Sequence, residues 1–126
     1  MAYRIRYPHI RPGAMETGTI AWILHRVTGV FLTLYLITHI IVIGQSVRGK
    51  EAFDAALNFV QSPLFVFLDA GLAGVVAFHG LNGLRIIAFD MGVGIRWQKP
   101  LFWASLILSV LIFVAGVWVA RNLIFV

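Results

Sequence analysis

The residues of this chain best suited to chemistry lie in one stretch, Phe78-His79-Gly80-Leu81-Asn82-Gly83-Leu84-Arg85. The stretch falls inside a mostly apolar run of about 25 residues, Leu64 to Ala88, which is long enough to cross a bilayer as an α-helix. A histidine inside a membrane is costly unless it has a partner or a function. Because imidazole is a common ligand of haem iron, His79 is a candidate axial ligand.

The spacing around His79 fits a bound macrocycle. Gly83 follows one helical turn later on the same face, where a missing side chain leaves room for a flat ring. Arg85 lies about 9 Å further along the helix axis than His79 and can meet a carboxylate on the edge of the cofactor. We therefore interpret His79 as an axial ligand and Arg85 as a propionate clamp. The alternative is that His79 hydrogen-bonds a neighbouring helix and that Gly80 and Gly83 serve close helix packing.

The composition is that of an integral membrane protein. Of the 126 residues, 60% are hydrophobic and only 12% are charged, about half the charged share of a soluble protein. The chain has no Cys, so it supplies no disulfide, thiolate metal site or iron–sulfur ligand. The net charge of +5 is typical of basic cytoplasmic loops, and no basic–aromatic pattern indicates a nucleic-acid partner. We predict one membrane-anchor domain over residues 1–126.

Three segments have the length and composition of membrane-spanning helices, at residues 20–44, 64–88 and 101–120. Ser62 and Pro63 are typical of a helix N-terminus and begin the second span. The loop before it contains apolar residues at the i, i+3, i+4, i+7 spacing of an amphipathic helix, Phe53, Ala56, Leu57 and Val60. The predicted fold is an all-α integral membrane protein with three transmembrane helices and a short amphipathic surface helix between the first and second.

The distribution of positive charge predicts the orientation. Residues 1–19 carry three arginines and the loop at residues 90–99 is also net positive, whereas the charges of the loop at residues 45–62 cancel. Lys and Arg are enriched in cytoplasmic loops. We therefore expect a multi-pass protein of the cell inner (cytoplasmic) membrane with the N-terminus cytoplasmic and the C-terminus outside.

Two further histidines lie in the first span. His25 is on the cytoplasmic half, as His79 is, whereas His39 lies near the outer end. Fourteen residues separate His25 from His39, about 21 Å of helix, so these two cannot hold opposite faces of one cofactor. His39 remains an alternative ligand to His79. A thin bundle of three helices encloses little, so we expect the second axial ligand to come from another chain.

Other classes of function have weaker support. The chain has no acid–base pair, nucleophile triad or phosphate-binding loop, so it is not expected to catalyse bond chemistry alone. A small transport subunit would need several polar residues aligned along the spans, and only Asp69 and His39 are suited to that role.

Two motifs resemble the signatures of one family. Leu24-His25-Arg26-Val27-Thr28-Gly29, preceded by Arg11-Pro12, resembles the first signature of the C-type membrane anchor (cytochrome b) subunit of succinate dehydrogenase, respiratory complex II. His79-Gly80-Leu81-Asn82-Gly83-Leu84-Arg85, followed by Phe89-Asp90, resembles the second. The motifs occur in the family's order within its three-span layout, so the resemblance covers nearly the whole chain.

The resemblance implies a haem b shared with a second, D-type anchor subunit, with His79 as one axial ligand. It places His25 and Arg26 near the haem propionates and the quinone pocket. It also implies an iron–sulfur subunit and a flavoprotein subunit on the cytoplasmic face, which carry the iron–sulfur clusters and FAD. Electrons would pass from succinate through these cofactors to quinone.

Trp22 departs from the family pattern. Ubiquinone-using members carry a quinone-binding Ser at this position, three residues before the motif histidine. We expect Trp22 and Arg26 to form part of the quinone site, and we favour menaquinone because an indole can stack on a naphthoquinone ring. The alternatives are an anchor of a quinol:fumarate reductase and a haem-free structural anchor. The number of haems and whether the whole complex is a trimer stay open.

Overall fold

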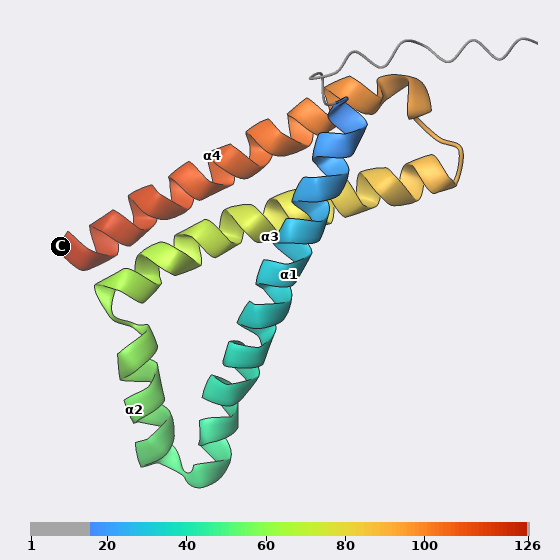
Figure 1. Cartoon of the computed structure of the whole chain (residues 1–126). Helices are drawn as coiled ribbons and strands as arrows, with labels where there is room; N and C mark the ends of the chain where they lie inside the picture. The colour runs from blue at the N-terminus through green and yellow to red at the C-terminus, as the bar shows by residue number, and fades with distance from the viewer. Residues whose placement is uncertain (1–15, 126) are drawn as a thin grey trace, which may run out of the picture.

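The computed structural model describes residues 16–125, and the side chains of residues 16–122. Three of its helices are long and apolar enough to cross a membrane. The elements in order are α1 (Thr17–Gly44), η1 (Gln45–Arg48), α2 (Lys50–Val60), α3 (Pro63–Asp90), η2 (Ile95–Trp97) and α4 (Gln98–Phe125) (Figure 1). The predicted all-α membrane fold, with a short helix between the first two spans, is confirmed. The arginines of the N-terminal segment and the Arg11-Pro12 motif lie outside the described residues.

The long helices extend beyond the predicted apolar spans. Helices α1, α3 and α4 have 28 residues each, because polar residues at their ends continue the helix past the apolar segment. The third span was predicted to begin at residue 101, but α4 begins at Gln98, two positions before Pro100. Proline is tolerated there because the first N–H groups of a helix have no acceptor within the helix.

Helix α2 and the two ends of α3 have the conformations that their local sequences favour. The face of α2 that was predicted to be apolar is half-buried, and the opposite face is exposed. Ser62 is the N-cap residue of α3 and Pro63 its first helical residue, as predicted, although the Ser62 hydroxyl makes no capping hydrogen bond. At the other end of α3, Gly92 has φ +77°, a left-handed conformation that glycine adopts without steric cost and that ends the helix.

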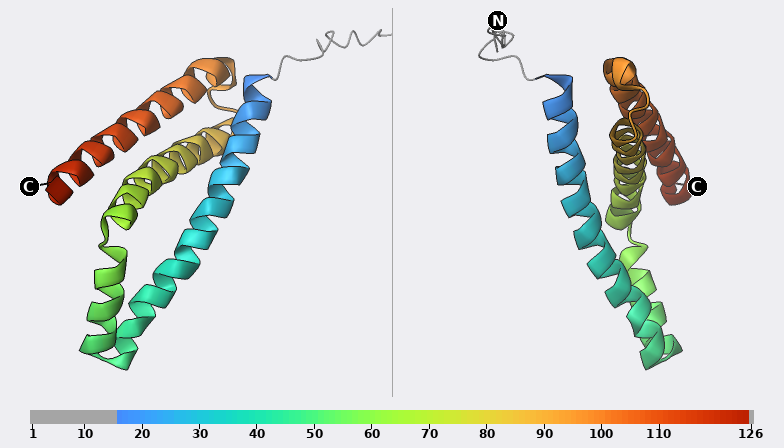
Figure 2. Two further views of the ribbon diagram at one scale, coloured as in Figure 1. Left: turned by 60° about the vertical axis from the view of Figure 1, so that its left-hand side comes forward. Right: turned by 90° about the vertical axis from the view of Figure 1, so that its right-hand side faces the viewer.

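Helix packing brings the start of α1, the end of α3 and the start of α4 to one end of the bundle. Figures 1 and 2 show α4 running beside α3, while α1 crosses α3 and then diverges from it. The chain returns through α2, which forms the third side of a triangle with α1 and α3 (Figure 1). The end at which α1, α3 and α4 begin or end together, at Thr17, Asp90 and Gln98, is called the crossing end below.

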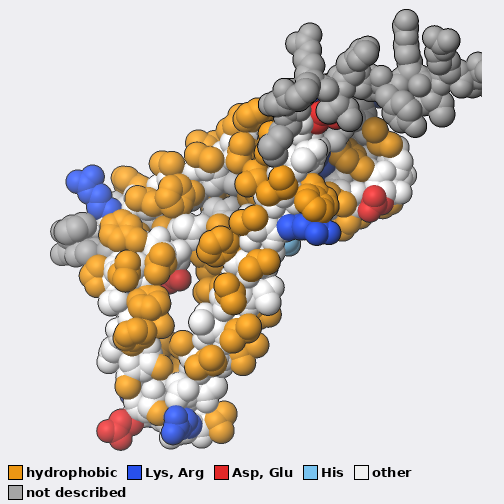
Figure 3. Space-filling view, in the orientation of Figure 1, with side chains coloured by type: hydrophobic (Ala, Val, Ile, Leu, Met, Phe, Trp, Pro, Cys, Tyr) orange, Lys and Arg blue, Asp and Glu red, His pale blue; other side chains and the backbone are white. Residues whose placement is uncertain are grey.

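Small residues allow α3 and α4 to approach closely. A Cβ atom at Gly74 would lie 2.9 Å from Phe113 Cβ, and one at Gly116 would lie 3.3 Å from Ala70 Cα. Ser109 is buried between the same helices. Near the crossing end, Ala21, Phe78 and Phe102 form a buried apolar cluster from all three long helices. Elsewhere large hydrophobic side chains are exposed (Figure 3), as expected of a surface that faces lipid or partner helices.

Candidate functional site

The imidazole rings of His25 and His79 stack on each other where α1 crosses α3. Their centroids are 4.0 Å apart and their planes differ by 8°. Two axial ligands of one metal must point nitrogens at it from opposite sides, and two parallel rings stacked face to face cannot do so. If one of the pair is an axial ligand, the opposite ligand therefore comes from elsewhere.

The His79 ring is hydrogen-bonded to α1 through its Nδ1 atom. This nitrogen lies 3.0 Å from Thr28 Oγ1 and 3.1 Å from the backbone oxygen of His25. Within the described residues Nε2 makes no hydrogen bond. A histidine bound through one nitrogen to a carbonyl oxygen presents the other nitrogen to a metal, which is the usual arrangement of a metal-ligating imidazole.

Glycines from both helices make room for the two rings. A Cβ atom at Gly29 would lie 3.1 Å from His79 Cε1, and one at Gly83 would lie 3.4 Å from His25 Cε1. Helices α1 and α3 therefore approach each other closely at Gly29. Gly83 was predicted to leave space for a macrocycle. In this chain, the atom that a Cβ at Gly83 would meet is Cε1 of His25.

Gly29→Ala is expected to displace the His79 ring and to leave the fold about 1–3 kcal/mol less stable than Gly83→Ala does, the usual cost of overpacking. Gly83→Ala is the matched control, because its Cβ would make an ordinary contact at 3.4 Å and alanine favours helix. Unfolding of each purified variant by SDS titration in detergent micelles measures its stability. Equal midpoints for the two variants would show that the His79 contact with Gly29 is not tight.

Asn82 and Arg85 form a buried polar group next to the histidine pair. Asn82 is completely buried, and its Nδ2 donates to the backbone oxygen of Ala21 at 3.3 Å. Arg85 Nη1 donates to Asn82 Oδ1 at 2.8 Å, and the guanidinium lies 5.9 Å from the ring of Phe102. The sequence interpretation assigned no role to Asn82. A buried amide three residues before a buried arginine was the available signal, since both need partners inside the bundle.

Two polar atoms at this site have no hydrogen-bond partner among the described residues. They are Nδ1 of His25 and Nε of Arg85, and both are buried. Buried polar atoms in proteins are nearly always paired. A bound group with acidic oxygens would therefore suit the end of the bundle where these two atoms lie.

Trp22 and Arg26 lie one turn apart on the exposed side of α1. The Arg26 guanidinium is 4.0 Å from the centroid of the Trp22 ring, a cation–π contact. Arg26 also lines a shallow apolar groove of about 270 Å³ that continues along α1 past Val30 to Leu34. A charged donor beside an apolar groove fits a flat polar ring with a long apolar tail.

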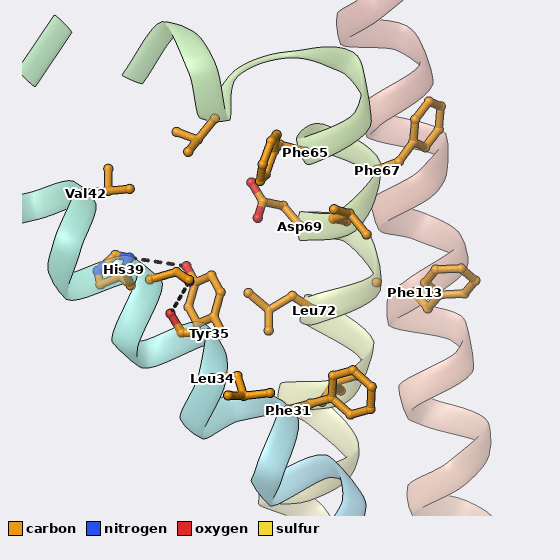
Figure 4. A pocket seen from close by; sticks show the side chains of 15 residues that line it. Phe31, Leu34, Tyr35, His39, Val42, Phe65, Phe67, Asp69, Leu72 and Phe113 are labelled. Atoms are coloured by element: carbon orange, nitrogen blue, oxygen red, sulfur yellow. Dashed lines mark hydrogen bonds between the residues drawn. The ribbon is translucent and has the colours of Figure 1, made fainter. Parts of the chain in front are cut away.

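His39 lies in a separate cavity in the half of the bundle remote from the crossing end. The cavity has a volume of about 700 Å³ and apolar walls from all four α-helices. Figure 4 shows Tyr35 and His39 on α1 across from Asp69 on α3, with His39 Nδ1 at 3.3 Å from the Tyr35 hydroxyl. The two polar residues considered for a transport role therefore line one cavity, but neither reaches the His25–His79 pair. Within residues 16–122 no three His, Asp or Glu side chains are grouped to hold a metal ion.

Comparison with known proteins gives one family. The model of the succinate dehydrogenase/fumarate reductase transmembrane subunit family matches residues 2–120. The chain is 42% identical over 103 residues to the "Succinate dehydrogenase hydrophobic membrane anchor subunit" of Halobacterium salinarum, covering 81% of this chain and 79% of the relative. It is 29% identical over 89 residues to the "Succinate dehydrogenase 2 membrane subunit SdhC" of Mycobacterium tuberculosis, covering 70% and 65%.

A relative from Archaeoglobus fulgidus, also named "Succinate dehydrogenase hydrophobic membrane anchor subunit", is 27% identical over 99 residues, 79% of this chain and 85% of the relative. The family match covers most of the chain, including both histidine motifs, the first two spans and nearly all of the third. With its three membrane-spanning helices, this chain belongs to the family of succinate dehydrogenase/fumarate reductase transmembrane subunits.

Proposed function

We propose that this chain is the haem b-binding, C-type membrane anchor of a succinate:quinone oxidoreductase. The observation that best supports this proposal is that His79 is hydrogen-bonded to α1 through Nδ1, which leaves Nε2 as the ligand nitrogen. The stacked His25 ring covers one face of His79 and limits its rotation. The chain thus offers one axial ligand, and a second, D-type anchor subunit would supply the other.

The other residues of the site fit a haem whose propionates point to the crossing end. His25 and Arg85 each have a buried polar nitrogen without a partner in the described residues, and propionate oxygens would accept from both. Asn82 holds Arg85 in position by accepting from its Nη1. Arg26 and Gly83 would border the group. Haem supplies a one-electron carrier within the membrane.

We place part of the quinone site at Trp22 and Arg26. Arg26 would donate to a quinone oxygen, and the Trp22 indole would lie against the ring. The apolar groove beyond Arg26 would accept the start of the isoprenoid tail. Because an indole stands where ubiquinone-using members have a serine hydroxyl, menaquinone is the favoured quinone. Extraction of quinone from the purified complex tests this choice, and tightly bound ubiquinone alone would contradict it.

The proposed assembly follows from the family and the charge pattern. The flavoprotein subunit with FAD and the iron–sulfur subunit would attach at the crossing end, which faces the cytoplasm in the orientation predicted from the arginines. The C-terminus would then lie outside the inner (cytoplasmic) membrane. An anchor of quinol:fumarate reductase is the second candidate, because the matched family includes both directions of the reaction.

The absorption spectrum of the purified complex tests the haem proposal. A difference spectrum, dithionite-reduced minus oxidised, should contain a b-type α-band. A haem-free complex that still reduces quinone would contradict haem binding and would identify the chain as a structural anchor that only contributes to the quinone site.

A further inference from the structure

The hydroxyl group of Thr28 lies between the backbone of α1 and the ring of His79. Oγ1 is 2.8 Å from the backbone oxygen of Leu24 and 2.9 Å from that of His25. It is also 3.0 Å from His79 Nδ1. A hydroxyl has one proton, and both carbonyl oxygens can only accept, so Thr28 donates to the helix backbone. Its lone pairs are then available to His79.

The protonation of His79 follows from the same contacts. Nδ1 lies 3.1 Å from the backbone oxygen of His25, an atom that can only accept a hydrogen bond. An unprotonated Nδ1 at that distance would place two lone pairs against each other. Nδ1 therefore carries the proton and donates it to the oxygens of His25 and Thr28. In the neutral ring Nε2 then has no proton and keeps its lone pair for a metal.

We propose that Thr28 is a positioning residue for the iron ligand. Its hydroxyl accepts from His79 Nδ1–H and donates to the α1 backbone. It therefore supports the tautomer with a bare Nε2 that the His25 backbone oxygen requires, and it fixes the direction of that nitrogen. A chain of two hydrogen bonds also increases the electron density on the ligand nitrogen. This role rests on the proposed function, in which His79 binds haem iron.

Thr33 provides an internal comparison. Its Oγ1 donates to the backbone oxygen of Gly29 at 2.9 Å, the same bond to the preceding helical turn that Thr28 makes. Thr33 is exposed, and within the described residues its hydroxyl makes no hydrogen bond to a histidine ring. Thr33→Val therefore removes a hydroxyl and its backbone bond from the same helix without touching the site, and it controls for the structural effect of such a change.

The test compares Thr28→Val, Thr28→Ser and Thr33→Val in the purified complex, with haem content and midpoint potential as readouts. In Thr28→Val a methyl group replaces the accepting oxygen 3.0 Å from Nδ1 and displaces the ring. We expect about 10-fold or more weaker haem retention, as for loss of other outer-shell partners. Haem that remains should have a higher midpoint potential, because a less basic ligand stabilises ferric iron less. A tenfold change in the relative stabilisation of ferric over ferrous haem corresponds to a change of about 59 mV in the one-electron midpoint potential.

Thr28→Ser keeps the hydroxyl and should restore both haem content and potential, which a merely space-filling role of Thr28 would not require. If Thr28→Val matches Thr33→Val in both readouts while the parent binds haem, the role of Thr28 is overturned and the haem proposal stands. If Thr28→Ser behaves as Thr28→Val, the hydroxyl is not the determinant and the role is again overturned. A parent complex without haem would overturn both proposals.

Discussion

His79→Ala is expected to remove the b-type α-band from the reduced-minus-oxidised spectrum of the complex. His79 is the histidine whose Nδ1 is bound to α1 and whose Nε2 is left for iron. Loss of a direct ligand should weaken haem retention by more than the about 10–100-fold typical of an outer-shell partner. Haem content per complex, determined on protein purified in parallel with the parent, measures the effect.

His39→Ala is the matched control for the loss of His79. His39 lies in the cavity remote from the crossing end, where Tyr35 is its hydrogen-bond partner. We expect the parental spectrum. An α-band that survives in His79→Ala and disappears in His39→Ala would assign the haem to the cavity that contains His39. Co-purification of the flavoprotein and iron–sulfur subunits should be unchanged in both variants, because neither histidine lies on the face proposed to bind them.

Arg26→Gln is expected to lower succinate:quinone reductase activity by about 10–100-fold. Hydrogen bonds to charged groups contribute about 1.5–3 kcal/mol, and each 1.36 kcal/mol corresponds to about a tenfold change in rate. The Arg26 guanidinium is exposed beside Trp22 and the apolar groove, so it is available to a quinone oxygen. The measurement is succinate oxidation with a menaquinone analogue as acceptor, compared with succinate oxidation by a water-soluble dye.

The dye assay separates quinone binding from assembly. Reduction of a dye by the soluble subunits does not require the membrane quinone site, so we expect it to be unaffected in Arg26→Gln. Arg121→Gln, an exposed arginine near the end of α4 remote from the crossing end, is the control for loss of positive charge. A parallel fall in both assays would make Arg26 an assembly residue. An unchanged quinone rate would remove Arg26 from the quinone site.

Several features of the fold were predictable because they depend on neighbours in sequence. A lipid-exposed segment must satisfy its backbone hydrogen bonds internally, so a sufficiently long apolar run becomes a helix. The three spans, the start of α3 at Ser62 and Pro63, and the half-buried face of α2 follow from local patterns of this kind. The start of α4 at Gln98 was missed because the third span was predicted from the apolar run that begins after Pro100, although proline is tolerated within the first turn of a helix.

The sequence by itself determined that the chain is a three-span membrane protein and that His79 is its most unusual intramembrane residue. Only the tertiary structure decided that His25 stacks on His79, that Thr28 contacts Nδ1, and that Asn82 joins Arg85 to α1. The contacts between α1 and α3 among them join residues more than 50 positions apart. They depend on the rotation of each helix and on where two helices cross. Those quantities are set by the fit of glycines and side chains across the interface, because hydrophobicity alone does not distinguish one face of an apolar helix from another.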